Sequence, residues 1–389
     1  MQKKIIALAL AAVAGSAAAQ TNVTVYGIVD LGQAFVKSSS VNGVAGQGTV
    51  GRLDSNSSYI GFKGVEDLGN GLKAVFQYET GFSADNAGAL AGGRDTFVGL
   101  TGGFGTAVAG NLTHPLRAFG AKVELVPAAA GIGTMASVTG RIGGANTGAD
   151  DRASNAIAYV SPSFGGFSGT VAYINGETKP NSAAAAAAKQ DVIGNYQICN
   201  GNVVLATATC SGTAAVNAGN ARAYQVAGQY DNGPLFVGAG YHKAVDIGGS
   251  ADSDARIYRV AAVYTLPTAT KLTALYDNTK VDGLNSFSKR TAWSVGAAQS
   301  FGKNTVGLEY GKSGDVKTQA GTTNNGASIW TAVYAYELSK RTSVHARYSR
   351  LSNDTAGGTN FYNNPVANTV ALNNDATVTG YMVGLRHAF

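Results

Sequence analysis

Bulky apolar side chains alternate with small or charged ones along the last residues of the chain, 377–389. The odd positions include Tyr381, Val383 and Leu385, whereas the even positions include Gly384 and Arg386. A period of two is the period of a β-strand. A strand that is apolar on one face and small or polar on the other fits the wall of an outer-membrane β-barrel. The terminal Phe389 would then lie in the aromatic girdle at the membrane interface.

The same kind of alternation recurs along the chain from residue 23 onward. Alternating stretches are joined in turn by short Gly, Asn or Pro turns, such as Asp67-Leu68-Gly69-Asn70-Gly71, and by longer polar connections. Short turns are typical of hairpins. Strict alternation of short and long connections is typical of a membrane barrel with turns at one end and loops at the other. The pattern therefore predicts an all-β fold, a transmembrane antiparallel β-barrel of about sixteen strands, wide enough for an aqueous channel.

The amino terminus has the pattern of an export signal. Two lysines precede an apolar stretch, residues 5–13, and Ala17-Ala18-Ala19 stands before Gln20. This is the order of a signal peptide and its cleavage site. A membrane-spanning helix is the alternative, but the stretch is shorter than the roughly 20 residues that a span needs. We expect residues 1–19 to be a signal peptide and residues 20–389 to form the barrel domain.

The composition agrees with a barrel in lipid. Charged residues make up 13% of the chain and the mean hydropathy is +0.01, whereas soluble domains are about 25% charged. An apolar outer face and a polar inner face would average to such values. The basic residues are scattered rather than clustered, which argues against nucleic acid as a partner.

Cys199 and Cys210 are the two cysteines of the chain. In an exported protein, a pair this close in sequence is expected to form a disulfide in an external loop. A metal site is the alternative, but no histidine or further cysteine stands nearby.

Signs of an enzyme are weak. The four histidines, at positions 114, 242, 345 and 387, do not have the spacing of metal ligands. The segment Gly131-Ile132-Gly133-Thr134-Met135-Ala136 fits a dinucleotide-binding pattern, but without the strand before it and the helix after it. We therefore predict no cofactor and no enzymatic activity.

Three segments carry a resemblance to a known family. They are Val23-Thr24-Val25-Tyr26-Gly27-Ile28-Val29-Asp30, Ile60-Gly61-Phe62-Lys63-Gly64-Val65-Glu66-Asp67-Leu68-Gly69-Asn70-Gly71-Leu72-Lys73-Ala74, and Val383-Gly384-Leu385-Arg386-His387-Ala388-Phe389. The chain resembles the Gram-negative general porin family in its β-proteobacterial branch. The resemblance implies a homotrimer of 16-stranded barrels in the outer membrane, in contact with lipid and lipopolysaccharide. It also implies that the third external loop folds into each pore, through which ions and small hydrophilic solutes pass.

The connection over residues 113–152 is much longer than an ordinary loop and is expected to have a function. A mobile surface loop is the plainer alternative. By resemblance it is the constriction loop, and its charged or titratable residues are His114, Arg117, Lys122, Glu124, Arg141, Asp150, Asp151 and Arg152. Enteric relatives have Pro-Glu-Phe-Gly-Gly at the tip, and this chain has Val123-Glu124-Leu125-Val126-Pro127, which makes Glu124 the candidate equivalent. We predict Arg117, Lys122, Glu124, Asp150 and Asp151 to lie at the constriction.

Strand parity selects residues of the wall opposite the loop. We expect lipid-facing positions at Ile60, Phe62, Phe97, Val295, Tyr334, Val383 and Leu385. This turns Lys63, Lys73, Glu79, Arg94 and Thr96 toward the lumen. By resemblance, Arg94 and Lys63 belong to a basic ladder. Arg347 and Arg386 are further lumen candidates. Where relatives often have Asn-Ser-Ile-Arg-Tyr, this chain has Asn155-Ala156-Ile157-Ala158-Tyr159, so one positive charge of the wall is missing.

Opposed charges across a narrow wet gap would orient polar solutes and disfavour apolar ones. The leading interpretation is a passive diffusion channel. One alternative is a channel selective for organic anions or sugars. Another is a barrel that serves as a surface adhesin or receptor through the Ala-rich loop near residues 182–189 and 199–210.

Overall fold

The computed structural model describes residues 22–86, 88–90, 92–142, 145–146, 148, 150–176, 196–199, 202–205, 219–247, 251–283, 286–362, 364–366 and 372–389. The predicted signal peptide, the Ala-rich stretch 182–189 and Cys210 lie outside these residues. Cys199 lies at the end of a short strand. The predicted pairing of the two cysteines therefore stays a prediction.

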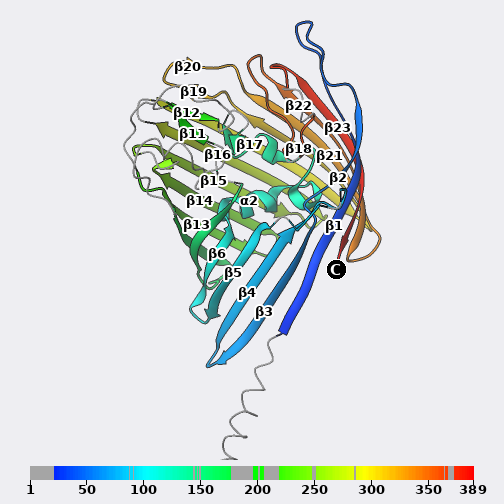
Figure 1. Cartoon of the computed structure of the whole chain (residues 1–389). Coiled ribbons are helices and arrows are strands. Elements are labelled where there is room, and N and C mark those ends of the chain that lie inside the picture. Colours follow the sequence, from blue (N-terminus) through cyan, green and yellow to red (C-terminus); the bar gives the residue numbers. More distant parts are fainter. Residues whose placement is uncertain are drawn as a thin grey trace, which may run out of the picture.

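Sixteen antiparallel strands close into a barrel within the described residues (Figure 1). Strand β1 pairs with β3 on one side and with β23 on the other, which closes the ring. The strands are β1 (Asn22–Ser38), β3 (Tyr59–Gly69), β4 (Leu72–Gly81), β5 (Gly93–Gly102), β6 (Gly105–Thr113), β9 (Arg152–Val160), β10 (Phe167–Asn175), β13 (Arg222–Asn232), β14 (Leu235–Val245), β15 (Asp254–Thr265), β16 (Thr270–Gly283), β17 (Ser286–Phe301), β18 (Asn304–Ser313), β21 (Ala327–Glu337), β22 (Thr342–Asn353) and β23 (Thr377–Ala388). The predicted all-β barrel and its strand number are confirmed.

Shorter elements lie in the connections. Strand β2 (Val50–Ser55) pairs with β1, and β19 (Lys317–Thr318) pairs with β17 and with β20 (Gly321–Thr322). Two small ribbons are formed by β7 (Arg141–Ile142) with β8 (Ala145–Asn146) and by β11 (Tyr196–Cys199) with β12 (Asn202–Leu205). The helical turns are α2 (Pro115–Val123), η1 (Pro127–Ala129) and η2 (Met135–Ser137). In the part of the chain that the structure describes, no helix is long and apolar enough to cross a membrane.

The alternation of side chains places large apolar groups on the outside of the barrel. Phe62, Val295, Tyr334, Val383 and Leu385 are all exposed there. In β23, Val383 is 58% exposed, whereas the neighbouring Met382 is 1% exposed and faces inward. An apolar outer surface of this kind suits a lipid environment.

Strand β5 departs from the predicted parity. Its exposed apolar residues are Val98 and Leu100, and Thr96 pairs with the exposed Tyr78 of β4. Phe97 therefore faces inward and Thr96 outward, the reverse of the prediction. The register between β4 and β5 also shifts near Arg94, where one residue of β4, Glu79, lies opposite two of β5, Arg94 and Asp95. In a regular strand Arg94 and Phe97, which are three positions apart, would point to opposite faces. The bulge between them reverses the face to which the residues beyond it point, so both side chains point inward.

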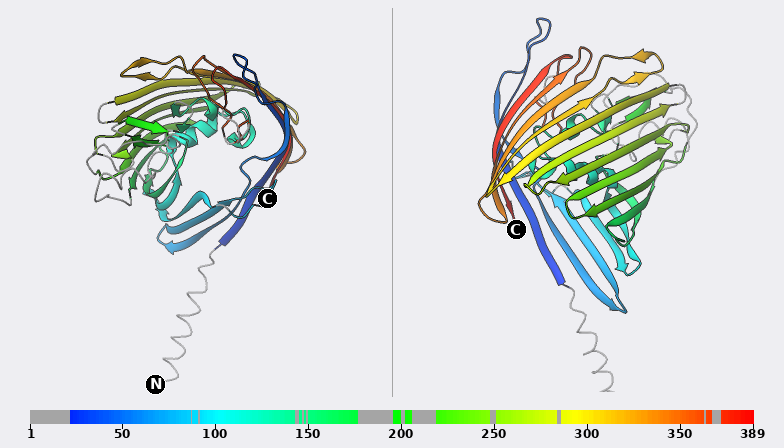
Figure 2. Two further views of the ribbon diagram at one scale, coloured as in Figure 1. Left: turned by 45° about the horizontal axis from the view of Figure 1, so that its top comes forward. Right: turned by 180° about the vertical axis from the view of Figure 1, so that it is seen from behind.

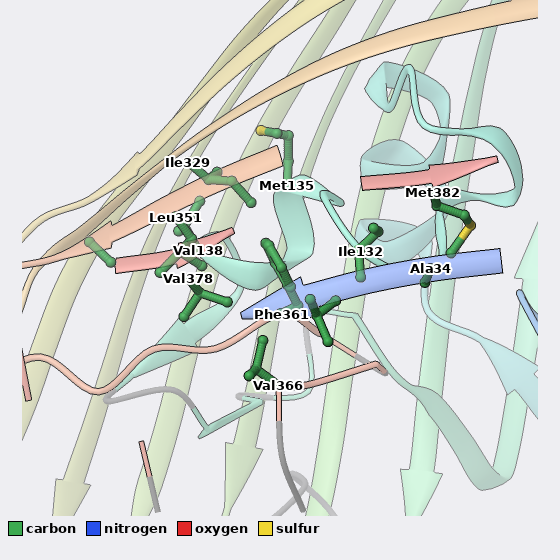
Figure 3. Close-up of a cluster of buried hydrophobic side chains, with 12 residues drawn as sticks. Ala34, Ile132, Met135, Val138, Ile329, Leu351, Phe361, Val366, Val378 and Met382 are labelled. Atoms are coloured by element: carbon green, nitrogen blue, oxygen red, sulfur yellow. The ribbon is translucent and has the colours of Figure 1, made fainter. Parts of the chain in front are cut away.

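The described residues of the segment 114–151, between β6 and β9, lie within the ring of strands in Figure 2. Its residues Ile132, Met135 and Val138 are buried in a hydrophobic cluster with side chains from the barrel wall (Figure 3). The wall contributes Ala34, Val36, Ala327, Ile329, Leu351, Val378 and Met382, and the connection between β22 and β23 adds Phe361 and Val366. Removal of this apolar surface from water holds the segment against β1 and β21–β23.

Candidate channel constriction

A central cavity of about 330 Å³ lies between the inner segment and the wall. Arginines from four elements line it, and two carboxylates line it as well. The arginines are Arg94 of β5, Arg117 of α2, Arg152 of β9 and Arg386 of β23, and the carboxylates are Glu124 and Asp150. The hydrogen-bond partner of each of these charged side chains decides how strongly its charge acts on the cavity.

Arg94 is held by an aromatic ring and a carboxylate. Its guanidinium lies 4.0 Å from the ring centroid of Tyr59, and its Nε donates to Glu79 Oε2 at 3.1 Å. Glu79 also accepts a hydrogen bond from the hydroxyl of Tyr26 at 2.8 Å. Stacking together with a charge-assisted hydrogen bond fixes the plane of the guanidinium. Glu79 and Arg94 thus lie together on the inner face.

The other three arginines of the cavity are fixed in similar ways. Arg152 Nε lies 3.3 Å from Asp95 Oδ1, and Arg386 Nη1 lies 3.3 Å from Asp30 Oδ2. Arg117 donates to the backbone carbonyl of Asp150, which is a neutral acceptor. Among the described contacts of these four arginines, Arg117 is thus the one whose hydrogen bond goes to a neutral carbonyl rather than to a carboxylate.

Glu124 turns toward the wall rather than toward the arginines. Its Oε2 accepts the backbone N–H of Met135 at 3.0 Å, and its carboxyl group lies beside that of Glu309 on β18. Burial raises the pKa of Glu124 to about 7, against the weaker opposing effect of its hydrogen bonds. A carboxyl group that shares a proton with another carries less than a full charge.

Asp150 is bound to a buried arginine. Arg259 of β15 donates to its two oxygens at 2.6 and 3.1 Å and also to Asp277 of β16 at 2.9 Å. Burial alone would raise the pKa of Asp150, but the charge and hydrogen bonds of Arg259 hold it below its usual range. Asp277 accepts the backbone N–H of Gly140 at 2.8 Å as well. Arg259 also donates to the carbonyl oxygen of Leu116 at 3.0 Å, so the cluster attaches both ends of the inner segment to two wall strands.

The remaining predicted residues lie elsewhere. Lys63 lies 4.9 Å from the ring centroid of Tyr26, Lys73 is exposed beside the turn between β3 and β4, and Lys122 pairs with Asp231. Arg347 is buried and donates to the carbonyl oxygens of Ala130 and Ile132 at 2.6 and 3.2 Å. The backbone carbonyl of Asp151 accepts the N–H of His114. Within the described residues, the lining of the central cavity does not include these five predicted residues.

Three residues that hold the inner segment were missed from the sequence, namely Arg259, Asp277 and Glu309. Strand parity could have placed Arg259 in the lumen, because Arg259 points to the same face of β15 as the buried Ile257 and Ala261. Within the described ranges, no group of three or more His, Cys, Asp or Glu residues could hold a metal ion.

Comparison with known proteins gives consistent results. A family model described as Gram-negative porin matches residues 7–356. Outer membrane porin protein 32 of Delftia acidovorans is 31% identical over 397 residues, which cover 100% of both chains. An outer membrane porin protein of Bordetella pertussis is 28% identical, again with 100% of both chains covered. Among solved structures, an anion-selective porin from Comamonas acidovorans has a TM-score of 0.74 and 27% identity, over 95% of this chain and 100% of that one.

Proposed function

The chain belongs to the Gram-negative porin family, and from this premise we propose that its channel favours small hydrophilic anions. Its relatives are outer-membrane porins, so the chain is a channel of the outer membrane for passive diffusion and not an enzyme. The preference for anions goes further and rests on the charges of the central cavity.

The observation that carries the proposal is the imbalance of charge at the cavity. Four arginines and two carboxylates line it, and the carboxylates that pair with three of the arginines, namely Glu79, Asp95 and Asp30, are not part of the described lining. In a narrow gap with walls of low dielectric constant, such an excess raises the local concentration of anions. Although Ala158 lacks the charge expected at its position, Arg152 on the same strand lines the cavity. The anion-selective porin from Comamonas acidovorans, with 27% identity, supports the same preference.

We also propose that residues 114–151 act as the third external loop and narrow the channel. The hydrogen bonds from Leu125 N–H to Glu309 at 2.7 Å and from the Thr331 hydroxyl to the carbonyl of Gly133 at 2.7 Å support this role. They attach the segment to inward-facing groups of β18 and β21. A segment fixed at several points narrows a channel to a constant width, which a mobile loop cannot do.

Assembly is proposed on the basis of the family. General porins act as trimers, and we infer that this chain forms a homotrimer seated between outer-membrane lipid and lipopolysaccharide. Its apolar outer face is compatible with both neighbours. Chemical cross-linking in native outer membranes should give a band of three subunits, and a band of one subunit alone would contradict the inference. The adhesin alternative depends on residues 182–189, which lie outside the described residues.

The selectivity is tested by the reversal potential of the purified channel in a planar bilayer with a gradient of potassium chloride. The wild-type protein should show the sign of a chloride-selective channel, and Arg152→Gln should move the potential toward zero. Arg350→Gln is a matched control, because Arg350 is an exposed residue of β22 on the opposite face of the strand from the buried Arg347. A cation-selective wild-type channel, or equal shifts in both variants, would overturn the proposal.

A further inference from the structure

A second cavity, of about 300 Å³, lies behind α2 and against the inner face of five wall strands. We call it the side cavity. Most of its lining on β5, β6, β9 and β10 is small or apolar and includes Phe97, Val108, Ala153, Ala156, Ala158 and Ala172, whereas Asp95 of β5 and Gln225 and Gln229 of β13 add polar groups. Phe119 of α2 covers it from the other side. An apolar hollow is unexpected in a lumen whose other cavity is lined by arginines.

The side cavity adjoins the arginines of the central cavity. Thr113 and Ala118 line both cavities, and Arg117, which lines the central one, stands between them in the chain. Arg152 lines the central cavity, while its hydrogen-bond partner Asp95 lines the side cavity. Thr113 and Ala118 thus border both cavities, and the ion pair of Arg152 with Asp95 links the lining of one to that of the other.

Polar atoms also border the hollow. His114 lines the side cavity and is 3% exposed. Its buried Nδ1 has no hydrogen-bond partner among the described residues. Burial lowers the pKa of His114 to about 4, so the ring is neutral at neutral pH. A buried polar atom without a partner is costly, and a water molecule that donates a hydrogen bond to Nδ1 would satisfy it.

We propose that the side cavity is a binding subsite for small carboxylic acids with an apolar body, of which an aromatic carboxylate is the simplest example. The ring would enter the hollow beside Phe97 and Ala158, and the carboxylate would remain at Arg117 and Arg152. This inference rests on the proposed anion preference and names the class of anion that the channel retains.

Size and energetics agree with this class. The cavity has about twice the volume of the roughly 150 Å³ apolar cavity that is known to admit benzene. Burial of an apolar ring removes it from water, which is favourable. Guanidinium groups bind carboxylates through two parallel hydrogen bonds. A solute with only one of these two features would gain only one of the two interactions.

The test measures how organic anions reduce the chloride current through single channels in a bilayer. Benzoate should reduce the current in a saturable way, with a half-effect at a concentration roughly tenfold lower than that of acetate, because acetate lacks the ring. Gluconate, which is at least as large as benzoate but hydroxylated, controls for size and should behave like acetate. Equal effects of benzoate and gluconate would overturn the proposal.

A substitution locates the effect. Ala158→Leu fills the hollow, and the advantage of benzoate over gluconate should be lost. Ala332→Leu adds the same side chain at an exposed position of β21 that alternates with the buried Thr331 and Val333, and it should keep the advantage. If Ala158→Leu left the advantage intact, or removed it only by lowering the chloride current itself, the subsite would be rejected. The reversal potential in potassium chloride, measured on the same channels, tests the anion preference separately.

Discussion

The buried carboxyl groups of Glu124 and Glu309 face each other across the boundary between the inner segment and strand β18, and neither Glu124 Oε1 nor Glu309 Oε2 accepts an N–H or O–H of the described residues. The backbone N–H groups of Met135 and Leu125 donate to the outer oxygens of the pair, at 3.0 and 2.7 Å. Two carboxyl groups can hydrogen-bond to each other only when they hold a proton between them. This contact therefore depends on pH, unlike the hydrophobic cluster that holds the same segment elsewhere.

The first prediction concerns this pH dependence. Because burial raises the pKa of Glu124 from 4.5 to about 7, the contact stabilises the attached segment fully below pH 4.5 and loses this effect as the pH rises through about 7. Protease cleavage within residues 114–151 should therefore increase between about pH 5 and about pH 8.5. Glu309→Gln supplies a neutral amide that can donate to Glu124 at any pH, and its cleavage should vary less.

Glu337→Gln is the control for this experiment, because Glu337 is an exposed residue at the end of β21. It should keep the wild-type dependence on pH. If wild type and Glu309→Gln respond identically to pH, the two carboxyl groups do not share a proton.

The second prediction concerns Arg259, which binds Asp150 and Asp277 with a side chain that is 0% exposed. Arg259→Gln leaves two buried carboxylates without their cation, a change that costs about 3–5 kcal/mol at buried ion pairs. We expect the inner segment to detach, which single-channel recordings would register as larger and noisier currents. Arg256→Gln removes a comparable but more exposed pair, with Asp282 at 2.6 Å, and should leave the recordings unchanged. Quiet wild-type currents in Arg259→Gln would contradict a role in attachment.

The barrel was predictable because its signal is repeated in every strand. Each strand has to be apolar outside and small or polar inside, so local alternation determines the fold. The site was less predictable, because it depends on contacts between distant strands. Glu124 was expected to face the arginines, but its partner Glu309 lies 185 positions later in the chain. Parity also failed at β5, where a bulge between Phe97 and Arg94 changed the facing without a clear mark in the sequence.

The third prediction concerns closure of the barrel at Phe389. Its backbone exchanges hydrogen bonds with Gly27 at 3.1 and 3.2 Å, and a Cβ at position 27 would lie 2.5 Å from its ring and 2.5 Å from the backbone oxygen of Tyr59 on the neighbouring strand. Gly27→Val should displace the ring and lower the temperature at which the folded barrel unfolds in detergent, as followed by heat-dependent gel mobility. Gly228→Val is the control, since a Cβ at that position of β13 would meet no atom within 4 Å. An equal loss in both variants would mean that the contact with Phe389 is not responsible.

The fourth prediction concerns Cys199 and Cys210. We expect a disulfide in an external loop, which mass spectrometry without reductant should detect as a linked peptide pair. A short loop of this kind stabilises its own segment by about 3 kcal/mol in the chain-entropy model. The double variant Cys199→Ala, Cys210→Ala should conduct normally. A loss of conductance would show that this loop belongs to the channel.

The last prediction distinguishes Arg94, which lines the central cavity, from Lys63, which does not. Arg94→Ala removes a positive charge and leaves the carboxylate of Glu79 with one partner fewer. The reversal potential should therefore shift toward the value of a cation-selective channel. Lys63 lies outside the lining of the central cavity, and Lys63→Ala should shift it less. Glu124→Ala should shift it toward anions, but weakly near neutral pH, because burial raises the pKa of Glu124 to about 7.

Salt concentration distinguishes this electrostatic effect from a change in the width of the channel. The Debye length falls from about 10 Å at 0.1 M to about 3 Å at 1 M salt, so a shift caused by charge should shrink in concentrated salt. A change in width would instead persist at every concentration. If neither Arg94→Ala nor Glu124→Ala alters the reversal potential at low salt, these residues are merely solvated groups of the lumen. A shift in Arg94→Ala that fades with salt would place the controlling field at the guanidinium beside Tyr59 and Glu79.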